Sequence, residues 1–343
     1  MTARFLARPY RLAVAALVPL AGAAGVGPGA PAATAAKPAP AFTLAALFKP
    51  PPVPAGTLAF DSNRTGSFQI FTMNADGTGT RQLTFGDQVD SWWARISPDR
   101  SRILFYRTPA GVPHDQSFDK TSLWVMNPDG SQQVQLRAPG ANGWQVQAQA
   151  QWSPDGTRMV MTGGATVNPQ IFVTDATGQS PRQVTFRSGV NVDPTWSPDG
   201  ATIAFVGCPV AACYPEDYEI YRIPVSGAAL ATRVTNDKLR DNDPQFSPDG
   251  TRIAWLTQTA TTPPVGEWNS RLALTDGTGM RWITRDSNVN SRPEWSRDGT
   301  AIYFHRLDFS LWPWFNLYRI RPDGTGLTIL TNSQMGSNEY PST

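Results

Sequence analysis

The most regular feature of the chain is a short apolar stretch that recurs directly after a tight polar turn. The turn reads Ser-Pro-Asp-Gly or a close variant, and its copies start at Ser97, Ser153, Ser197, Ser247 and Ser296. A bulky residue precedes each copy, and three mostly apolar residues such as Ile203-Ala204-Phe205 follow a few positions later. Because proline presets φ at the second turn position and Asp and Gly suit the next two, each copy predicts a hairpin turn between two strands.

A second strand follows in every repeat, as in residues 69–73 and 219–222. Asp-Gly pairs such as Asp76-Gly77 often come next, and this dipeptide is typical of hairpins that need positive φ. The last strand ends in a Leu-Thr-like pair, with Leu136-Arg137 as the deviant copy. Short strands at such a regular spacing predict a β-propeller, and counting the second strands predicts six units.

The first of these units lacks the strand that follows the serine turn elsewhere. The end of the chain, Tyr340-Pro341-Ser342-Thr343, resembles the stretch Asp193-Pro194-Thr195-Trp196 that leads into a turn in another unit. We therefore expect an all-β fold, a six-bladed β-propeller of four-stranded blades whose ring is closed by the C-terminal strand. Closure of this kind leaves no large unpaired sheet edge.

Taken together, the Ser-Pro-Asp-Gly turn after an aromatic residue, the Ile-Ala-Phe strand, the Asp-Gly turn and the Leu-Thr ending resemble the TolB-type, WD40-like propeller repeat. The resemblance covers about residues 58–343. It implies a protein of the bacterial cell envelope that works by binding partner proteins without catalysis. TolB itself carries an α/β domain before its propeller, whereas a signal-like segment and a Pro/Ala-rich segment precede the repeat in this chain.

The N-terminal segment predicts export. Residues 1–36 combine three arginines, no acidic residue, an apolar stretch and small residues near the end, as in a secretory signal peptide. The alternative is a single membrane anchor, but the apolar stretch contains Pro19 and is shorter than the ~20 residues that a span requires. Residues 37–54 are rich in Ala and Pro and predict a spacer before a propeller of residues 55–343. We expect a periplasmic or secreted protein without a membrane span after cleavage.

The charge balance excludes one class of partner. Removal of Arg4, Arg8 and Arg11 with the signal leaves 26 of the 29 Lys and Arg against 27 Asp and Glu. Binding to a nucleic acid requires many cations that replace the counterions of the phosphates, so no nucleic-acid partner is expected. A protein or peptide partner, a monomeric state and no cofactor are the remaining expectations.

Candidate binding residues concentrate on one side of the predicted propeller. The serine turns and the Asp-Gly turns share one face, so the longer and more variable loops share the other, which we call the loop face and where we expect binding. Aromatic residues that do not fit the strand pattern are expected there, either as packing lids or as a contact surface for a protein, peptide or glycan. These are Trp92, Trp93, Trp144, Trp268, Trp312 and Trp314, with His114 in a neighbouring loop.

A second set of candidates lies four residues before each turn serine, on the strands expected to line the centre of the ring. The set comprises Trp93, Gln149, Asp193, Asp243 and Arg292. Asp193 and Asp243 fall in adjacent units and could begin a cation site, but two carboxylates are an incomplete ligand set. The alternative is a solvated polar rim in which Arg292 balances the charge, and we expect no metal.

The remaining chemistry is sparse. Cys208 and Cys213 are the only cysteines, and in an exported protein their spacing predicts a local disulfide. The only histidines, His114 and His305, lie in other units, so a four-ligand zinc site is not expected. There is no Gly-x-Ser-x-Gly motif of a serine hydrolase. The sequence predicts an exported non-catalytic scaffold, and the alternative is an exported carbohydrate-active enzyme, a glycoside hydrolase or lyase that uses the loop face.

Overall fold

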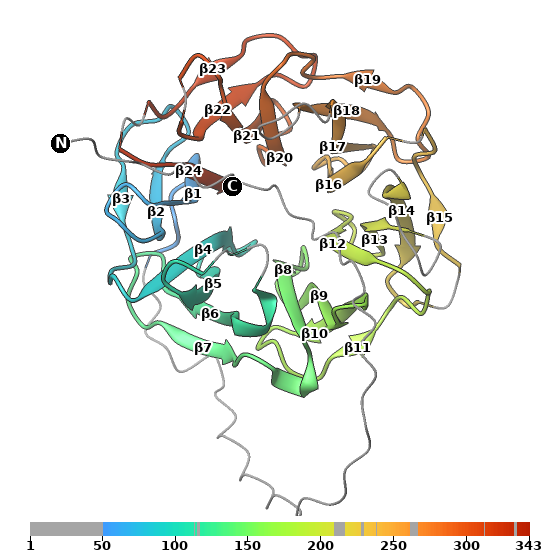
Figure 1. The fold of residues 1–343 in the computed structure, drawn as a ribbon, viewed down its shortest axis with the longest axis horizontal. Helices are drawn as coiled ribbons and strands as arrows, with labels where there is room; N and C mark the ends of the chain where they lie inside the picture. Colours follow the sequence, from blue (N-terminus) through green and yellow to red (C-terminus); the bar gives the residue numbers. More distant parts are fainter. Residues whose placement is uncertain are drawn as a thin grey trace, which may run out of the picture.

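The computed structural model describes residues 51–112, 114, 117–208, 217–227, 230–237, 239–260, 267–311, 313–332 and 335–343. These residues form strands β1 to β24, and the helical segments among them are the short 3₁₀ turns η2 (Phe118–Lys120) and η3 (Ala141–Gly143). Figure 1 shows the strands grouped in sheets around a common axis. The predicted all-β propeller is confirmed.

Four sheets of four strands occur in the described part of the chain, and in each of them the strands follow one another from the axis outwards. They are β24 (Asn338–Ser342), β1 (Thr57–Ser62), β2 (Gln69–Asn74) and β3 (Arg81–Gln82); β4 (Val89–Ile96), β5 (Ile103–Pro109), β6 (Ser122–Met126) and β7 (Val134–Arg137); β8 (Val146–Trp152), β9 (Arg158–Ala165), β10 (Asn168–Asp175) and β11 (Arg182–Gln183); and β12 (Asn191–Trp196), β13 (Thr202–Gly207), β14 (Glu219–Pro224) and β15 (Thr232–Arg233).

A fifth sheet holds eight strands. It comprises β16 (Asp241–Phe246), β17 (Arg252–Ala260), β18 (Glu267–Leu274), β19 (Arg281–Trp282), β20 (Val289–Trp295), β21 (Ile302–Leu307), β22 (Asn316–Ile320) and β23 (Thr328–Ile329). Its two halves meet where β18 and β20 run parallel, and one residue pair, Trp268 with Val289, joins them. The C-terminal strand β24 pairs antiparallel with β1 near the other end of the described chain.

The serine turns form because their side chains replace backbone hydrogen bonds locally. In each copy the Ser hydroxyl donates to the turn Asp at 2.5–2.7 Å. The same hydroxyl accepts the backbone N–H five residues later at 2.9–3.0 Å. In one copy, hydrogen bonds from Ser153 and Thr157 lower the pKa of Asp155 to about 2. The turn aspartates are therefore structural, as predicted.

The Leu-Thr pairs have an equally local role. In five sheets or half-sheets the Thr hydroxyl oxygen accepts a backbone N–H of the neighbouring third strand at 2.8–2.9 Å; the hydroxyls are those of Thr84, Thr185, Thr235, Thr284 and Thr331. In the deviant copy the Arg137 guanidinium, 2% exposed, donates to Gln147, Asn142 and the Gly178 carbonyl. Arg137 therefore stabilises the end of the sheet through its guanidinium hydrogen bonds, where the other units use the Thr hydroxyl.

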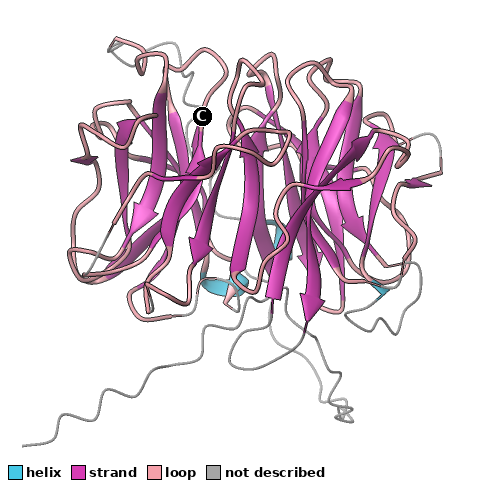
Figure 2. Cartoon of the chain, turned by 90° about the horizontal axis from the view of Figure 1, so that it is seen from above, coloured by secondary structure: helices cyan, strands magenta, loops and turns pink. Residues whose placement is uncertain are grey.

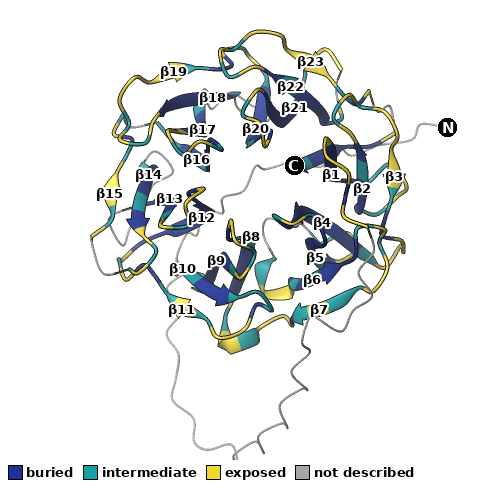
Figure 3. Ribbon diagram, turned by 180° about the vertical axis from the view of Figure 1, so that it is seen from behind, coloured by how far each residue is buried: buried dark blue, intermediate teal, exposed yellow. Residues whose placement is uncertain are grey.

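Strands nearer the axis are more deeply buried than strands at the outer edge. The inner strands are almost wholly buried, whereas the two-residue outer strands such as β3 and β15 are largely exposed (Figure 3). Apolar residues of adjacent sheets form shared clusters, as where Trp196 of β12 packs with Val160 and Ile171 of the preceding sheet. Burial of such side chains contributes about 2 kcal/mol each to folding, which makes these seams the core of the molecule.

The chain reaches the propeller through the end of the predicted spacer. Val53 is 5% exposed, and its N–H donates to the Arg100 carbonyl at 2.9 Å. The Arg100 side chain donates in turn to the Val53 carbonyl at 2.6 Å. None of the helices in the described ranges is long and apolar enough to cross a membrane.

Candidate functional site

Each inner strand carries one residue in the left-handed region of backbone space. These residues, which we call the axial ring, are Trp93 (φ 61°), Gln149 (57°), Asp193 (51°), Asp243 (50°), Arg292 (51°) and Tyr340 (49°). At each of them the pairing with the next strand shifts register, which is a β-bulge. Left-handed backbone is unfavourable for side chains larger than glycine, so six copies of it mark a feature that the surrounding structure enforces.

Side chains of the axial ring contact one another. Arg292 Nη1 lies 3.2 Å from Asp243 Oδ1. The Arg292 guanidinium also lies 3.4 Å from the centre of the Trp93 ring, although β24 stands between β20 and β4 around the axis. The Tyr340 ring packs against the Trp93 ring at 5.1 Å. These side chains thus form a connected polar and aromatic network on the inner strands.

Burial controls the charges in this network. It raises the pKa of Asp193 well above its ordinary value, and the Asp243 carboxyl adds to the effect. Burial also raises the pKa of Asp243, against the attraction of Arg292. Nearby, burial and the Arg292 charge lower the pKa of Arg95 to about 9. Burial and the same two arginines lower the pKa of His305 to about 3, so this imidazole is neutral.

Several polar atoms in the network lack a hydrogen-bond partner in the described structure. They are Asp193 Oδ2, Arg95 Nε and Nη2, and Arg292 Nε. Buried groups of this kind are normally satisfied by water or a ligand. The axial ring can therefore offer both acceptors and donors to a bound polar group.

Most of this ring was predictable from the sequence. Five predicted positions come together as expected from their shared place before the turns: Trp93, Gln149, Asp193, Asp243 and Arg292. Tyr340 was missed as a member, because no serine turn follows it. The signal was present in the match between the chain end and residues 193–196, which aligns Tyr340 with Asp193.

Two tryptophans expected in loops, Trp92 and Trp268, lie in strands instead, whereas Trp93 lies on an inner strand as its place before the turn serine predicts. Trp92 and Trp93 lie in β4 and Trp268 lies in β18, and they are only 2–4% exposed. Trp92 stacks on His114, and Trp268 lies beneath the Arg240 guanidinium. The strands are longer on the loop-face side than their apolar pattern indicates, so these rings enter the core.

The other aromatic candidates are distributed differently. Trp144 lies between strands, where its ring packs on Phe172 at 4.4 Å and covers Gly163, at which a Cβ would collide with it. Trp144 therefore acts as a packing lid, the first of the two alternatives. Trp314 is half-buried, and Trp312 lies outside the described residues.

His114 and Cys208 have structural surroundings. The His114 Nε2 atom is 3.1 Å from Asp90 Oδ2, and the same carboxylate oxygen accepts the Gly111 N–H. This arrangement fixes the loop after β5. Cys208 is fully buried at the end of β13, whereas Cys213 lies outside the described residues, so their disulfide stays a prediction.

Exposed apolar side chains occur on both sides of the molecule, and five of them lie on the loop face, the lower side of the molecule in Figure 2, where both 3₁₀ turns lie. We call them the loop-face apolar set: Phe85 (69% exposed), Val167 (68%), Phe186 (74%), Phe309 (39%) and Leu311 (40%). They lie in connections between β3 and β4, β9 and β10, β11 and β12, and β21 and β22. Phe309 and Leu311 belong to a variable loop that the sequence predicts on this face. The other three were not predicted, although Phe85 and Phe186 each follow a Leu-Thr-like pair directly.

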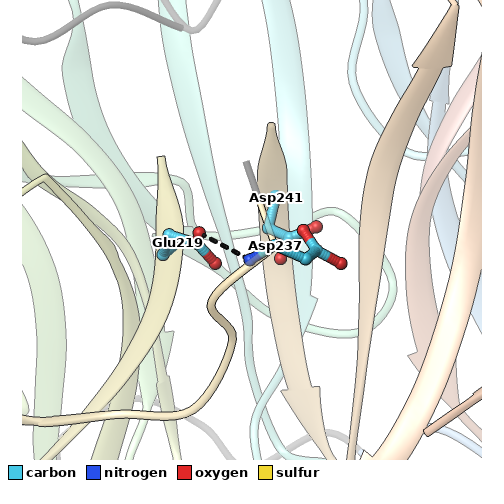
Figure 4. Close-up of side chains that lie close together, drawn as sticks. All are labelled: Glu219, Asp237 and Asp241. Atoms are coloured by element: carbon cyan, nitrogen blue, oxygen red, sulfur yellow. Dashed lines mark hydrogen bonds between the residues drawn. The ribbon is translucent and has the colours of Figure 1, made fainter. Parts of the chain in front are cut away.

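An acidic group of three side chains was also missed. Glu219, Asp237 and Asp241 place one oxygen each within 4.8 Å of the others (Figure 4). They come from β14, the connection after β15, and β16. No spacing motif links them, because the contact arises only where neighbouring sheets meet.

Comparison with known proteins supports the propeller resemblance. A TolB homologue of Chlorobium luteolum is 33% identical over 180 residues, which cover 51% of this chain and 37% of that protein. A putative tricorn protease homologue of Streptomyces coelicolor is 30% identical over 120 residues, 33% of this chain and 10% of that protein. The chain thus matches well under half of these relatives' length. No protein-family model matches it.

Solved structures share the fold. TolB from Acinetobacter baumannii aligns with a TM-score of 0.65 and 18% identity over 84% of this chain and 66% of that one. An oligogalacturonate lyase in complex with manganese aligns with a TM-score of 0.53 and 14% identity over 80% and 73%. The repeat motifs, the arrangement of the sheets and the sequence similarity to the Chlorobium protein together show a β-propeller protein that is similar to TolB proteins.

Proposed function

We propose that this protein is a non-catalytic propeller scaffold that binds a protein or peptide partner at the bacterial cell envelope, through the loop face. The observation that carries the proposal is the loop-face apolar set. Phe85, Phe309 and Leu311 come from two sheets that follow one another around the axis. Single exposed apolar residues are common, but aromatic and aliphatic side chains presented together on one face of a rigid scaffold are typical of a contact surface.

Affinity capture from the envelope fraction of the source bacterium tests this proposal. The bait is the chain without residues 1–36, and captured proteins are identified by mass spectrometry and then purified for calorimetry. The variant Phe85→Ser/Phe309→Ser/Leu311→Ser should weaken binding of the purified partner by at least tenfold, because truncated anchors at an interface often cost more than ~1.4 kcal/mol.

A matched control uses the opposite face. Met280 and Leu327 are 49% and 45% exposed and lie in the short turns of the other side. Met280→Ser/Leu327→Ser should bind the partner as the unmodified chain does. Equal losses in both variants, or no specific partner, would contradict binding through the loop face.

We also propose that the propeller has six blades and is closed by β24. Both halves of the eight-stranded sheet have the strand order of the four-stranded sheets, and a single residue pair joins them. Counting the halves separately adds two blades to four. The repeat of one left-handed residue on each of six inner strands supports the same count, and the pairing of β24 with β1 supports closure.

The proposed location follows from the N-terminal segment and the TolB resemblance. Residues 1–36 should direct the chain out of the cytoplasm as a signal peptide and be removed, leaving the spacer of residues 37–54 and the propeller of residues 55–343 as a monomer. Fractionation of expressing cells, with N-terminal sequencing of the exported form, tests this. Retention of the full chain in the cytoplasm or the membrane would contradict it.

A carbohydrate-active enzyme remains the second candidate, and one observation favours it. The carboxyls of Asp193 and Asp243, both with raised pKa, lie beside Arg292 near the axis, an arrangement that acid–base chemistry uses. Incubation with polygalacturonate and Mn²⁺, followed by ultraviolet detection of unsaturated products, tests a lyase. Activity that Asp193→Asn abolishes would establish the enzyme and overturn the non-catalytic proposal.

A further inference from the structure

The acidic group stands at a position that repeats around the molecule on the loop face. In each repeat unit with a Leu-Thr pair, the Thr hydroxyl accepts a backbone N–H of the third strand from the axis. The side chain of interest belongs to the residue directly before the one that donates this N–H, and it lies at the junction with the next sheet. In four units this preceding residue is an amide: Gln69, Gln170, Asn269 and Asn316. In β14 it is Glu219.

The facing position lies on the inner strand of the next unit, two residues before the axial ring. It is neutral in five inner strands, as Ser91, Gln147, Asn191, Asn290 and Asn338. In β16 it is Asp241. Where Asn269 and Asn290 face each other, one amide donates to the other at 3.3 Å. The fold therefore accepts neutral side chains at both positions, and the junction of β14 with β16 replaces both by carboxyls.

These two carboxyls are among the most deeply buried acids of the described chain. Glu219 and Asp241 are both 0% exposed, and Asp237 from the connecting loop joins them with its side chain 27% exposed. Figure 4 shows the three side chains close together, with the Glu219 carboxyl accepting the Asp237 N–H. Burying carboxylates this close is unfavourable unless opposite charge or protons compensate them.

The described residues supply only part of the compensation. Glu219 accepts hydrogen bonds from Arg233, from Thr235 and from the Asp237 N–H. Asp237 pairs with Arg271. Asp241 Oδ1 accepts a hydrogen bond from Thr257 at 2.6 Å, and the buried Oδ2 atom has no hydrogen-bond partner that meets distance and angle criteria among the described residues. Among the described residues, two arginines thus face three acids, and one buried carboxylate oxygen of the group has no hydrogen-bond partner.

We propose that the junction of β14 and β16 binds a divalent cation, best matched by Ca²⁺, through Glu219, Asp237 and Asp241. The group offers oxygen ligands alone, with the hydroxyls of Thr235 and Thr257 beside the carboxyls. Hard cations prefer such ligands, and Ca²⁺ tolerates the irregular geometry of a site assembled from three elements better than Mg²⁺ does.

Binding requires one rearrangement that the structure permits. Arg233 lies on the outer strand β15 with its side chain 38% exposed, so it can leave Glu219 for solvent when the ion enters. Arg271 can remain beside Asp237, since its guanidinium also stacks on the Trp282 ring at 4.3 Å. The ion would then tie the loop after β15 to the strands on both sides of the junction.

Isothermal titration calorimetry with CaCl₂ on the chelator-treated, desalted propeller tests the site, with thermal unfolding as a second readout. The unmodified protein should bind one Ca²⁺ and melt at higher temperature as Ca²⁺ rises into the millimolar range, about 1–10 mM for a weak structural site. Glu219→Gln/Asp241→Asn should weaken Ca²⁺ binding by about 100-fold or more, because it removes two charged ligands. This variant is expected to fold, since it restores the amides found at the other junctions.

The control variant Asp87→Asn/Asp119→Asn makes the same change in net charge at two exposed loop-face acids. Its Ca²⁺ affinity should stay within about twofold of the unmodified protein. Three results would overturn the proposal: no Ca²⁺ uptake by the unmodified protein, uptake retained in the amide variant, or equal affinity for Mg²⁺ and Ca²⁺.

Discussion

At the scale of single residues, His305 shows how the core controls charge. Its ring is 2% exposed, packs against Tyr340 and Phe315, and accepts the Tyr340 N–H at Nδ1. Burial, with Arg292 and Arg95 nearby, lowers its pKa to about 3, against about 6.5 for an unfolded chain. Below pH 6.5 the unfolded chain binds more protons, so the free energy of unfolding falls as pH drops from 6.5 toward 3.

The variant His305→Gln should remove this pH dependence. Between pH 7 and pH 5 the unmodified protein should lose about 2 kcal/mol of unfolding free energy more than the variant does. Urea unfolding at both pH values measures the difference. Buried Asp61 has a raised pKa and acts in the opposite sense, but its contribution is common to both proteins and cancels. An identical pH response in the two would show that His305 is not held neutral by the fold.

Thr185 represents the Leu-Thr pairs. Its buried hydroxyl accepts the Ile171 N–H at 2.9 Å and donates to Gln170 at 2.8 Å. Thr185→Val preserves the shape but leaves both partners unsatisfied, so it should lower the free energy of unfolding by about 1–3 kcal/mol. Thr232→Val on the exposed outer strand β15 is the control and should change it by less than about 0.5 kcal/mol. Equal effects of the two substitutions would refute the structural role of the pair.

The role of a residue could be predicted where its side chain forms hydrogen bonds within its own turn. The hydrogen bonds of Ser153 and Asp155 lie within a few residues, so their spacing reveals them. The burial of Trp92 or Trp268 depends on neighbouring strands and on cationic side chains far along the chain, such as Arg240. The spacing of residues along the chain does not reveal such contacts, which is why the strand pattern predicts loop positions for these two rings.

At the scale of elements, the serine turns located the first hairpin of each unit because proline, Asp and Gly specify the reversal locally. The register shift that creates the axial ring is less visible, since it follows from the pairing of two strands. Proline after Asp193, Asp243, Arg292 and Tyr340 marks four of its six positions. Repeated proline inside an apparent strand is a sequence signal of a bulge.

The last strand should be essential to the fold. Deletion of residues 338–343 removes the partner of β1, the Ser342 hydroxyl that accepts the Ile96 N–H, and the Tyr340 ring beside Trp93. The truncated chain should lose cooperative thermal unfolding and form aggregates in size-exclusion chromatography, because β1 becomes an open edge. A synthetic peptide of residues 335–343 should restore the monomer. A truncated chain that melts like the full protein would contradict closure by β24.

At the scale of the whole molecule, the propeller separates two faces of different character. The serine turns are short and alike on one face, whereas the connections of the loop face differ in length and carry the loop-face apolar set. The difference between the faces could be predicted from the sequence, because turn lengths alternate along the repeat. The exposure of Phe85, Val167 and Phe186 could not be predicted, because it depends on which apolar side chains pack into the core.

Site-specific photo-crosslinking in the source bacterium tests binding through the loop face most directly. A benzophenone amino acid is placed singly at Phe85, Phe186 and Phe309 on the loop face, and at Met280 and Leu327 on the opposite face. We expect one protein adduct of common identity from the loop-face positions and none from the other two. Adducts from both faces alike, or none at Phe85 and Phe309, would contradict binding through the loop face.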